Sequence, residues 1–192
     1  METKTKIINI IGGPGVGKST IATGVFTQLK QKGVDCELAS EYAKDITWEE
    51  HTNLFNNQIH LFAEQFRRQY RLLDKVDYVI CDSPLILNAI YLDFFLERTE
   101  KKYFDSDYIY LQKHFFNETF AQFNNLNYYI TRLNKYYTPT GRVHSLKESQ
   151  DIDQKITASL LVYDPNHFVC AGSTTDIIDE IVRVTLEGYN DV

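Results

Sequence analysis

Short apolar runs recur along the chain, and most are followed by a longer segment with a helical spacing of apolar positions. Apolar runs of about four to eight residues that end in glycine or polar residues are typical of buried strands. The pattern predicts five strands, at residues 6–11, 34–40, 78–81, 126–133 and 167–171. Strands that alternate with helices indicate a parallel sheet covered on both faces, so the predicted fold class is α/β.

Helix signals lie between these strands. Gly33 is placed to end the first helix. Thr47 with Glu50, and Ser145 with Glu148, match the capping-box pattern that opens a helix. Helices are therefore predicted at residues 18–32, 47–73, 84–97, 106–124, 145–163 and 175–188.

Length and composition favour one domain over residues 1–192, with 43% hydrophobic residues to build a core. Apolar stretches are far shorter than the roughly 20 residues that span a bilayer, so no membrane partner is expected. The first residues, METKTKIINI, lack the pattern of a secretion signal, and the expected location is the cytoplasm. Cys36, Cys81 and Cys170 lie in or beside predicted strands without metal-ligand spacing, which indicates small buried side chains.

The net charge of −6 argues against a sequence-independent grip on nucleic acid, because such a grip depends on Lys and Arg that neutralise phosphates. A local basic groove remains compatible with this charge. Nucleic acid is therefore a possible partner that the composition does not favour.

A glycine-rich phosphate loop follows the first predicted strand and precedes the first helix. Its GxxxxGK[ST] spacing lets backbone N–H groups turn toward a phosphate at the N-terminus of a helix. Lys18 is expected to bridge the β- and γ-phosphates and Ser19 to ligate magnesium. The residues expected to bind the nucleotide are Gly12, Gly13, Pro14, Gly15, Val16, Gly17, Lys18, Ser19 and Thr20.

Asp82 ends the apolar run at residues 78–81. A carboxylate at this place can hold magnesium through water, as the second acidic element of P-loop enzymes does. It can also cap the helix that starts near Pro84, and the two roles are compatible.

Four segments together resemble the small-molecule P-loop kinases, namely the nucleoside and nucleotide kinases and the nicotinamide riboside kinase domain. They are IIGGPGVGKST at 10–20, EYAKD at 41–45, CDSP at 81–84 and TGRVHSLKESQDIDQKI at 140–156. The resemblance extends to small P-loop proteins often found in phage genomes. LNKYY at 133–137 does not match the base-reading motif of GTPases. The resemblance implies a three-layer sandwich with a five-stranded parallel sheet and a short lid at about residues 134–149.

The resemblance also implies residue roles. Glu41 matches the acid that follows the second strand in nucleoside kinases and accepts the proton of the attacking hydroxyl, with Asp82 as the competing base. Arg142 falls in the lid, where arginines clamp the moving phosphoryl group, and Arg132 is a second candidate. Gln58 lies where nucleoside kinases place an amide that reads the acceptor base. Phe55 and Phe62 could stack on that base, although core packing is the better interpretation of both.

The leading functional hypothesis is a phosphotransferase that uses ATP and Mg²⁺ on a nucleoside, nucleotide or nicotinamide riboside-like acceptor. One alternative is a kinase that phosphorylates a hydroxymethylated base in DNA. Another is an ATPase or nucleotide-dependent switch with no small acceptor. A homodimer is possible, because dimers are common among the kinases that the chain resembles.

Overall fold

Five parallel strands form the centre of the computed structural model, which describes residues 3–96, 105–133 and 144–190. The strand order is β2-β3-β1-β4-β5, and every neighbouring pair is parallel. The strands are β1 (Lys6–Ile11), β2 (Cys36–Ala39), β3 (Tyr78–Cys81), β4 (Asn124–Ile130) and β5 (Phe168–Cys170). All five overlap the predicted apolar runs, which confirms the parallel α/β sheet.

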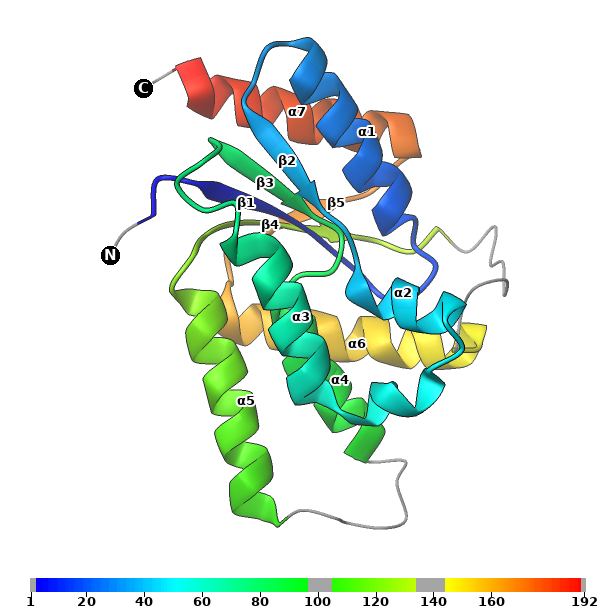
Figure 1. Ribbon diagram of the computed structural model, residues 1–192. Helices are drawn as coiled ribbons and strands as arrows, with labels where there is room; N and C mark the ends of the chain where they lie inside the picture. Colours follow the sequence, from blue (N-terminus) through cyan, green and yellow to red (C-terminus); the bar gives the residue numbers. More distant parts are fainter. Residues whose placement is uncertain (1–2, 97–104, 134–143, 191–192) are drawn as a thin grey trace.

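Helices cover both faces of this sheet, so the molecule has three layers (Figure 1). Helices α1 and α7 lie over one face, whereas α3, α4, α5 and α6 lie over the other (Figure 1). The helices are α1 (Lys18–Gln31), α2 (Tyr42–Trp48), α3 (Gln58–Tyr70), α4 (Ile86–Leu96), α5 (Ser106–Ala121), α6 (Leu146–Tyr163) and α7 (Thr174–Asn190), with a 3₁₀ turn η1 (Thr52–Asn56).

Strand β1 lies in the middle of the sheet, between β3 and β4. Its register pairs Asn9 with Cys81 on one side and Ile11 with Tyr129 on the other. The carboxyl ends of β1, β3 and β4 therefore reach the same edge of the sheet, which is where parallel α/β folds bind ligands. The phosphate loop follows β1 at this edge.

The two larger hydrophobic clusters of the described residues hold the layers together. On one face, Ile8 and Ile10 of β1 pack with Val25 of α1 and Ile181 of α7. On the other face, Ile11 joins aromatic side chains of α3 and α5. The Phe62 ring stacks on the Phe116 ring with centroids 4.4 Å apart, so Phe62 is a core residue. The three cysteines are buried free thiols.

The capping box predicted at Thr47 and Glu50 is wrong. Thr47 lies inside α2, where its hydroxyl donates to the carbonyl of Ala43, and Glu50 has a positive φ of 58°. Helix α3 starts later, capped by Asn57, whose side chain accepts from the N–H of His60 at 3.0 Å. The spacing of Thr47 and Glu50, three positions apart, does not by itself show where a helix starts and which of its backbone N–H groups lack a partner within the helix.

The second capping box is confirmed. The Ser145 side chain accepts from the N–H of Glu148, and the Glu148 carboxylate accepts from the N–H of Ser145. Gly33, with φ of 80°, follows the end of α1 as predicted. Strand β4 ends earlier than predicted, at Ile130, which leaves Arg132 in the segment after the strand.

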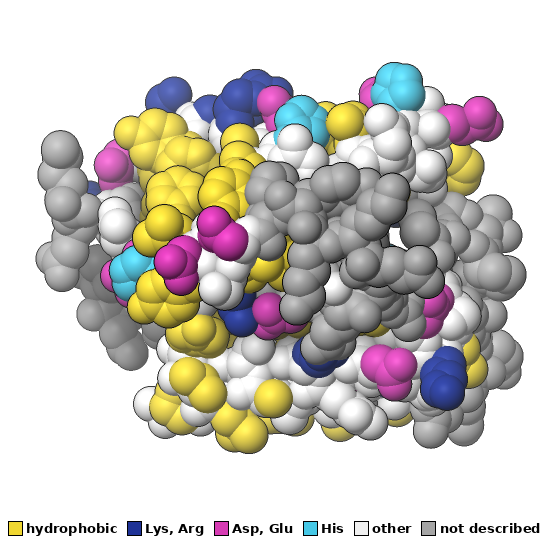
Figure 2. Space-filling model, turned by 90° about the horizontal axis from the view of Figure 1, so that it is seen from below, with side chains coloured by type: hydrophobic (Ala, Val, Ile, Leu, Met, Phe, Trp, Pro, Cys, Tyr) yellow, Lys and Arg dark blue, Asp and Glu magenta, His cyan; other side chains and the backbone are white. Residues whose placement is uncertain are grey.

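Hydrophobic side chains also gather on the lower surface of the molecule, which Figure 2 shows from below relative to the view in Figure 1. On α5, the exposed large hydrophobic side chains are Tyr108, Tyr110, Leu111 and Phe115. Most of the predicted lid, Arg142 included, lies outside the described residues.

Within the described part of the chain, no helix combines the length and the apolar character needed to cross a membrane.

Candidate functional site

The phosphate loop links β1 to α1. Gly15 and Gly17 adopt positive φ angles of 85° and 97°, which favour glycine. Lys18 is the first residue of α1, is 9% exposed, and donates from Nζ to the carbonyl of Gly13 at 3.1 Å. Burial lowers the pKa of the Lys18 ammonium, while the charges of Glu41, Asp82 and Asp153 act to raise it. The loop therefore offers backbone N–H groups and a buried cation to an anion.

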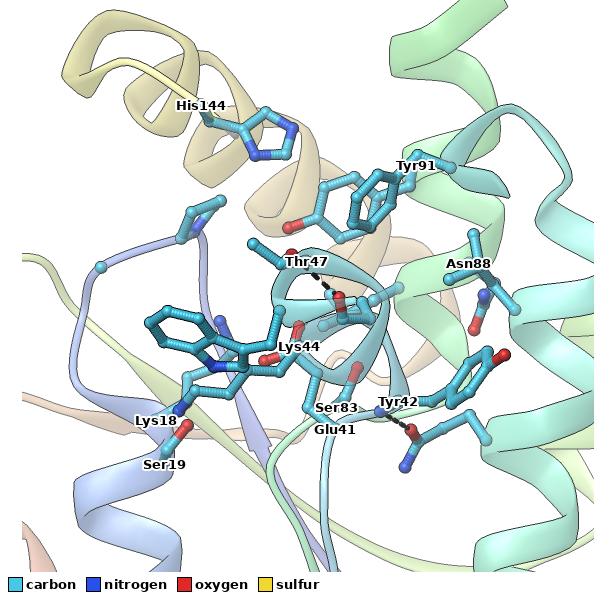
Figure 3. Close-up of a pocket in the computed structure, with 18 of the residues that line it drawn as sticks. Lys18, Ser19, Glu41, Tyr42, Lys44, Thr47, Ser83, Asn88, Tyr91 and His144 are labelled. Atoms are coloured by element: carbon cyan, nitrogen blue, oxygen red, sulfur yellow. Dashed lines mark hydrogen bonds between the residues drawn. The ribbon is translucent and has the colours of Figure 1, made fainter. Parts of the chain in front are cut away.

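A cavity of about 290 Å³ adjoins this loop (Figure 3). This volume is near the lower end of ligand pockets, which span about 300–1,000 Å³. Residues of the phosphate loop, α1, α2, η1, α3 and α4 contribute to its wall. The lining includes Pro14, Gly15, Gly17, Lys18, Ser19, Thr20, Glu41, Tyr42, Lys44, Thr47, Trp48, Phe55, Gln58, Gln65, Ser83, Leu87, Asn88, Tyr91 and His144.

Glu41 lies in this cavity, between the end of β2 and the start of α2 (Figure 3). Its carboxylate makes no capping hydrogen bond to the described backbone of α2. Burial raises the pKa of the Glu41 carboxyl, Lys18 lowers it, and the charge of Asp82 raises it further. A carboxylate with a raised pKa, open to a cavity and near the phosphate loop, suits proton acceptance.

Asp82 follows β3 and is 6% exposed. Its Oδ1 atom is buried and has no hydrogen-bond partner among the described residues. Burial raises the pKa of the Asp82 carboxyl, and a hydrogen bond with the Ser19 side chain lowers it. Helix α4 begins only at Ile86, so Asp82 is not at its N-cap position.

The oxygen atoms of Asp82 and Ser19 fit a magnesium ion. A buried carboxylate oxygen without a partner and a neighbouring hydroxyl are hard ligands of the kind that Mg²⁺ prefers. Among the described residues, no three His, Cys, Asp or Glu side chains are grouped to hold a metal by themselves. The remaining ligands would come from nucleotide phosphates and water, as is usual for Mg²⁺.

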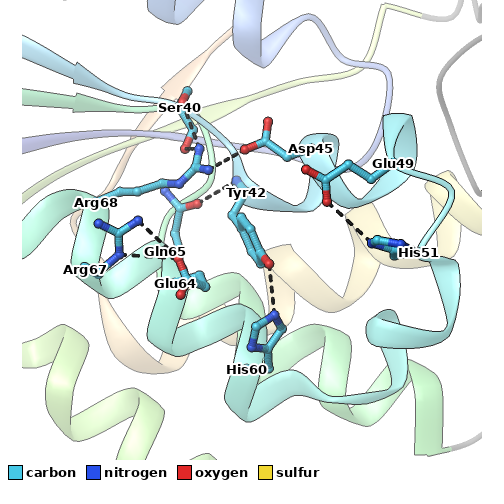
Figure 4. A network of polar contacts seen from close by, with 10 residues as sticks. All are labelled: Ser40, Tyr42, Asp45, Glu49, His51, His60, Glu64, Gln65, Arg67 and Arg68. Carbon is cyan, nitrogen blue, oxygen red and sulfur yellow. Dashed lines mark hydrogen bonds and ion pairs between the residues drawn. The ribbon is translucent and has the colours of Figure 1, made fainter.

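Helix α2, which begins next to Glu41, is held by polar contacts with α3 (Figure 4). The backbone N–H of Tyr42 donates to Gln65, and the Tyr42 hydroxyl contacts His60 at 2.9 Å. Arg68 forms an ion pair with Asp45 and donates to Ser40. Gln65 also contacts the Cys81 thiol at 3.7 Å, directly before Asp82. These contacts set the position of the Glu41 backbone relative to β3.

Gln58, predicted to read the acceptor, lines the cavity and is 4% exposed. Its Nε2 donates to the carbonyl of Phe55 at 2.8 Å, and Nδ2 of Asn88 donates to its Oε1 at 3.5 Å. Phe55 also lines the cavity, in η1 rather than on the face of α3. The Gln58 amide is therefore oriented by its neighbours.

Arg132 lies beside the phosphate loop but is not among the described residues that line the cavity. Its Nε donates to Asp153 at 2.6 Å, and its Nη2 donates to the carbonyl of Pro14 at 2.9 Å.

Several cavity residues escaped sequence reasoning, because single aromatic and polar residues in helices give no local signal of function. Trp48, the sole tryptophan, lines the cavity and is 66% exposed. Lys44, Asn88, Tyr91 and His144 also line it. Their common position became visible only when α2, α4 and the start of α6 were placed around the loop.

Comparison with known proteins assigns this sequence to a family. Residues 7–164 match the family model described as the AAA domain. The chain belongs to this AAA domain family. No protein of curated function matches the sequence.

Two solved structures share the fold of this AAA domain protein. Deoxyadenosine kinase from M. mycoides with products dCMP and a flexible dCDP bound has a TM-score of 0.62 and 17% identity, over 97% of this chain and 100% of that one. The NadR protein in complex with NR has a TM-score of 0.61 and 15% identity, over 88% of this chain and 46% of that one. The chain thus spans about half of the NadR chain. At these identities the likeness establishes the P-loop kinase fold.

Proposed function

We propose that this AAA domain protein is a phosphotransferase that uses ATP and Mg²⁺ to phosphorylate a nucleoside, nucleotide or nicotinamide riboside-like acceptor. The observation that carries the proposal is a single cavity with Lys18 and Ser19 at one part, Glu41 on its wall and Gln58 with Asn88 at another part. In this proposal the cavity joins a donor site at the phosphate loop to an acceptor site at Gln58 and Asn88, and the Glu41 carboxylate lies on the wall that they share. The deoxyadenosine kinase and NadR structures support it through their fold and through the dCMP and NR that they hold.

The phosphate loop is the donor end of this site. Lys18 would leave the carbonyl of Gly13 and bind the β- and γ-phosphates of ATP, while the backbone N–H groups of the loop receive phosphate oxygens. Ser19 and Asp82 would hold Mg²⁺, which neutralises negative charge on the phosphates when bound. Thr20, Gly12, Gly13 and Val16 belong to the same nucleotide-binding segment.

Glu41 is proposed as the general base. It would accept the proton of the acceptor hydroxyl while that oxygen forms a bond to the γ-phosphorus and the bond to the β–γ bridging oxygen breaks, releasing ADP. Asp82 is the weaker candidate, because its hydrogen bond with Ser19 and its buried Oδ1 suit a metal ion. Arg142, in the segment between Leu133 and His144, stays the proposed clamp on the transferred phosphoryl group.

The buried Gln58 and the half-buried Asn88 make the acceptor end polar. An amide presents one donor side and one acceptor side, which matches the edge of a nucleobase or a nicotinamide carboxamide. Phe55 and Tyr91 add ring surfaces to the same cavity. An acceptor with a flat polar ring and a hydroxyl that reaches Glu41 therefore matches the side chains that line this cavity.

The test is a screen of candidate acceptors with labelled ATP and Mg²⁺, in which labelled product is measured. Transfer to a nucleoside, a nucleotide or nicotinamide riboside is the expected result. Failure of all of them, together with transfer to DNA that contains a hydroxymethylated base, would instead support the DNA-modifying alternative. ATP hydrolysis that no acceptor changes would support an ATPase or switch and refute the kinase proposal.

A further inference from the structure

A buried ion pair between Arg132 and Asp153 contacts the phosphate loop from the side of α6. Asp153 Oδ1 accepts from the backbone N–H of Gly13 at 2.8 Å, and Asp153 Oδ2 accepts from Nε of Arg132 at 2.6 Å. Arg132 also donates from Nη2 to the carbonyl of Pro14 at 2.9 Å and to that of Ser149 at 3.4 Å. One pair of side chains therefore holds a donor and an acceptor of the loop backbone.

The contact is close and shielded from water. The side chains of Arg132 and Asp153 are only 9% and 13% exposed. A Cβ atom on Gly13 would lie 2.2 Å from Asp153 Oδ1 and 2.9 Å from the carbonyl oxygen of Ser149. The position therefore requires glycine because the Asp153 carboxylate occupies the space that a side chain would fill.

The pair is also linked to the lysine of the loop. The carbonyl of Gly13 accepts from Lys18 Nζ, so the residue that Asp153 holds through its N–H also holds Lys18. Any displacement of Asp153 would therefore shift both the backbone of the phosphate loop and the Lys18 ammonium that it binds.

We propose that Asp153 is a positioning residue that fixes the Gly13–Pro14 part of the phosphate loop for ATP, and that Arg132 acts through Asp153. The inference rests on the proposed function in that the loop binds ATP. Arg132 neutralises the carboxylate, which otherwise would be a buried negative charge beside a site for an anion. Removing Arg132 alone therefore weakens ATP binding in two ways. Asp153 loses the ion pair that holds it in place, and its negative charge is left unpaired beside the phosphate site.

A direct contact between Arg132 and a phosphate of ATP is the competing role, and a double-variant cycle separates the two. Under the positioning role, Arg132→Gln raises the Kd of Mg·ATP at least about tenfold, which is about 1.4 kcal/mol. Adding Asp153→Asn then restores binding at least about fivefold, because no unpaired charge remains and the amide oxygen can still accept from Gly13. Under direct contact, the double variant binds no better than Arg132→Gln.

The control is Asp151→Asn, which removes a carboxylate two residues away on α6 and should leave the Kd of Mg·ATP unchanged. Trp48, the sole tryptophan, lines the cavity and provides a fluorescence signal for the titrations. The single variants should retain the wild-type affinity for the acceptor, because their effect is confined to the loop.

Hydrogen exchange without nucleotide tests the positioning role independently of ATP. Asp153→Ala should cause loss of protection in the peptide that covers residues 10–17, whereas Asp153→Asn and Asp151→Asn should cause little loss. Should Arg132→Gln fail to fold, this comparison of Ala with Asn at position 153 decides the proposal. Unchanged protection in Asp153→Ala would overturn it. If the wild-type protein does not bind ATP but Asp153→Ala still loses protection relative to it, the positioning role is upheld and the proposed kinase is refuted.

Discussion

Replacing Glu41 by glutamine should impair phosphoryl transfer and stabilise the ligand-free protein. The substitution keeps the size of the side chain but removes the ionisable group. Because burial raises the pKa of the Glu41 carboxyl above its ordinary value of 4.5, the folded protein binds this proton more tightly than the unfolded chain. At neutral pH the ionised carboxylate is therefore a cost to folding that glutamine avoids.

The sign of the pH dependence follows from this shift. The Glu41 carboxyl makes its full contribution to the free energy of unfolding below pH 4.5. This contribution is lost as the pH rises through the pKa of the carboxyl in the folded protein. The stability advantage of Glu41→Gln should be near zero below pH 4.5 and reach a plateau above the folded-state pKa. Each unit of pKa shift is worth about 1.4 kcal/mol. For a chain of this size that corresponds to about 3–6 °C in the melting temperature.

The loss of the base should reduce kcat about 10²–10⁴-fold, which is the usual contribution of a positioned general base. That range corresponds to about 2.7–5.5 kcal/mol of activation free energy. The affinity for Mg·ATP should change far less, since the phosphates bind to the loop and not to Glu41.

Urea denaturation at pH 4, 6 and 8 measures the stability difference, and labelled ATP measures transfer. Glu37→Gln is a matched control, because Glu37 lies on β2, the strand before Glu41. Its side chain is 46% exposed and forms a surface ion pair with Lys30. The control should leave kcat unchanged. A variant Glu41→Gln that is less stable than wild type at pH 8, or that loses ATP binding and transfer equally, would refute the reasoning.

Three further predictions test the rest of the site and one correction to the fold. Lys18→Ala should lower turnover at least about 10²–10³-fold with an unchanged circular dichroism spectrum, and near-normal turnover would exclude Lys18 from phosphate binding. Asp82→Asn should raise the Mg²⁺ concentration for half-maximal activity about 10–100-fold, and an unchanged requirement would contradict the metal role. Asn57→Ala should cost about 1 kcal/mol in urea denaturation, because it removes the cap of α3. Asn56→Ala should cost less than about 0.5 kcal/mol, and equal losses would contradict the cap.

The fold was largely predictable because its signals are local. Strand β1 reads as an apolar run whose residues Ile7–Ile11 are all buried, and the glycines after it turn the chain into α1. The capping box of Ser145 and Glu148 was correct for the same reason, since its two hydrogen bonds join residues three positions apart. The Thr47 pattern had the same spacing but failed, because α2 already occupied that segment through its contacts with α3.

Part of the candidate site was predictable, and part was not. Glu41 and Asp82 were predicted from their places after strands, and Gln58 from the place where nucleoside kinases carry an amide that reads the base. The structure puts Glu41 and Gln58 in one cavity wall, with Asp82 beside Ser19. Asp153 was not identified. It lies 140 positions from Gly13, and no sequence pattern connects a carboxylate in a helix with the backbone of a distant loop.

The sequence by itself determined the phosphate loop, because eight contiguous residues carry the backbone freedom, the cation and the hydroxyl that the site needs. Tertiary structure decided what surrounds that loop. The strand order places β1 between β3 and β4, which brings Asp82 to one side of the loop and Arg132 to the other. Contacts between α2 and α3 place Glu41, and α6 supplies Asp153. These positions depend on how helices pack around the sheet, and packing between distant segments leaves no signature in any short stretch of sequence.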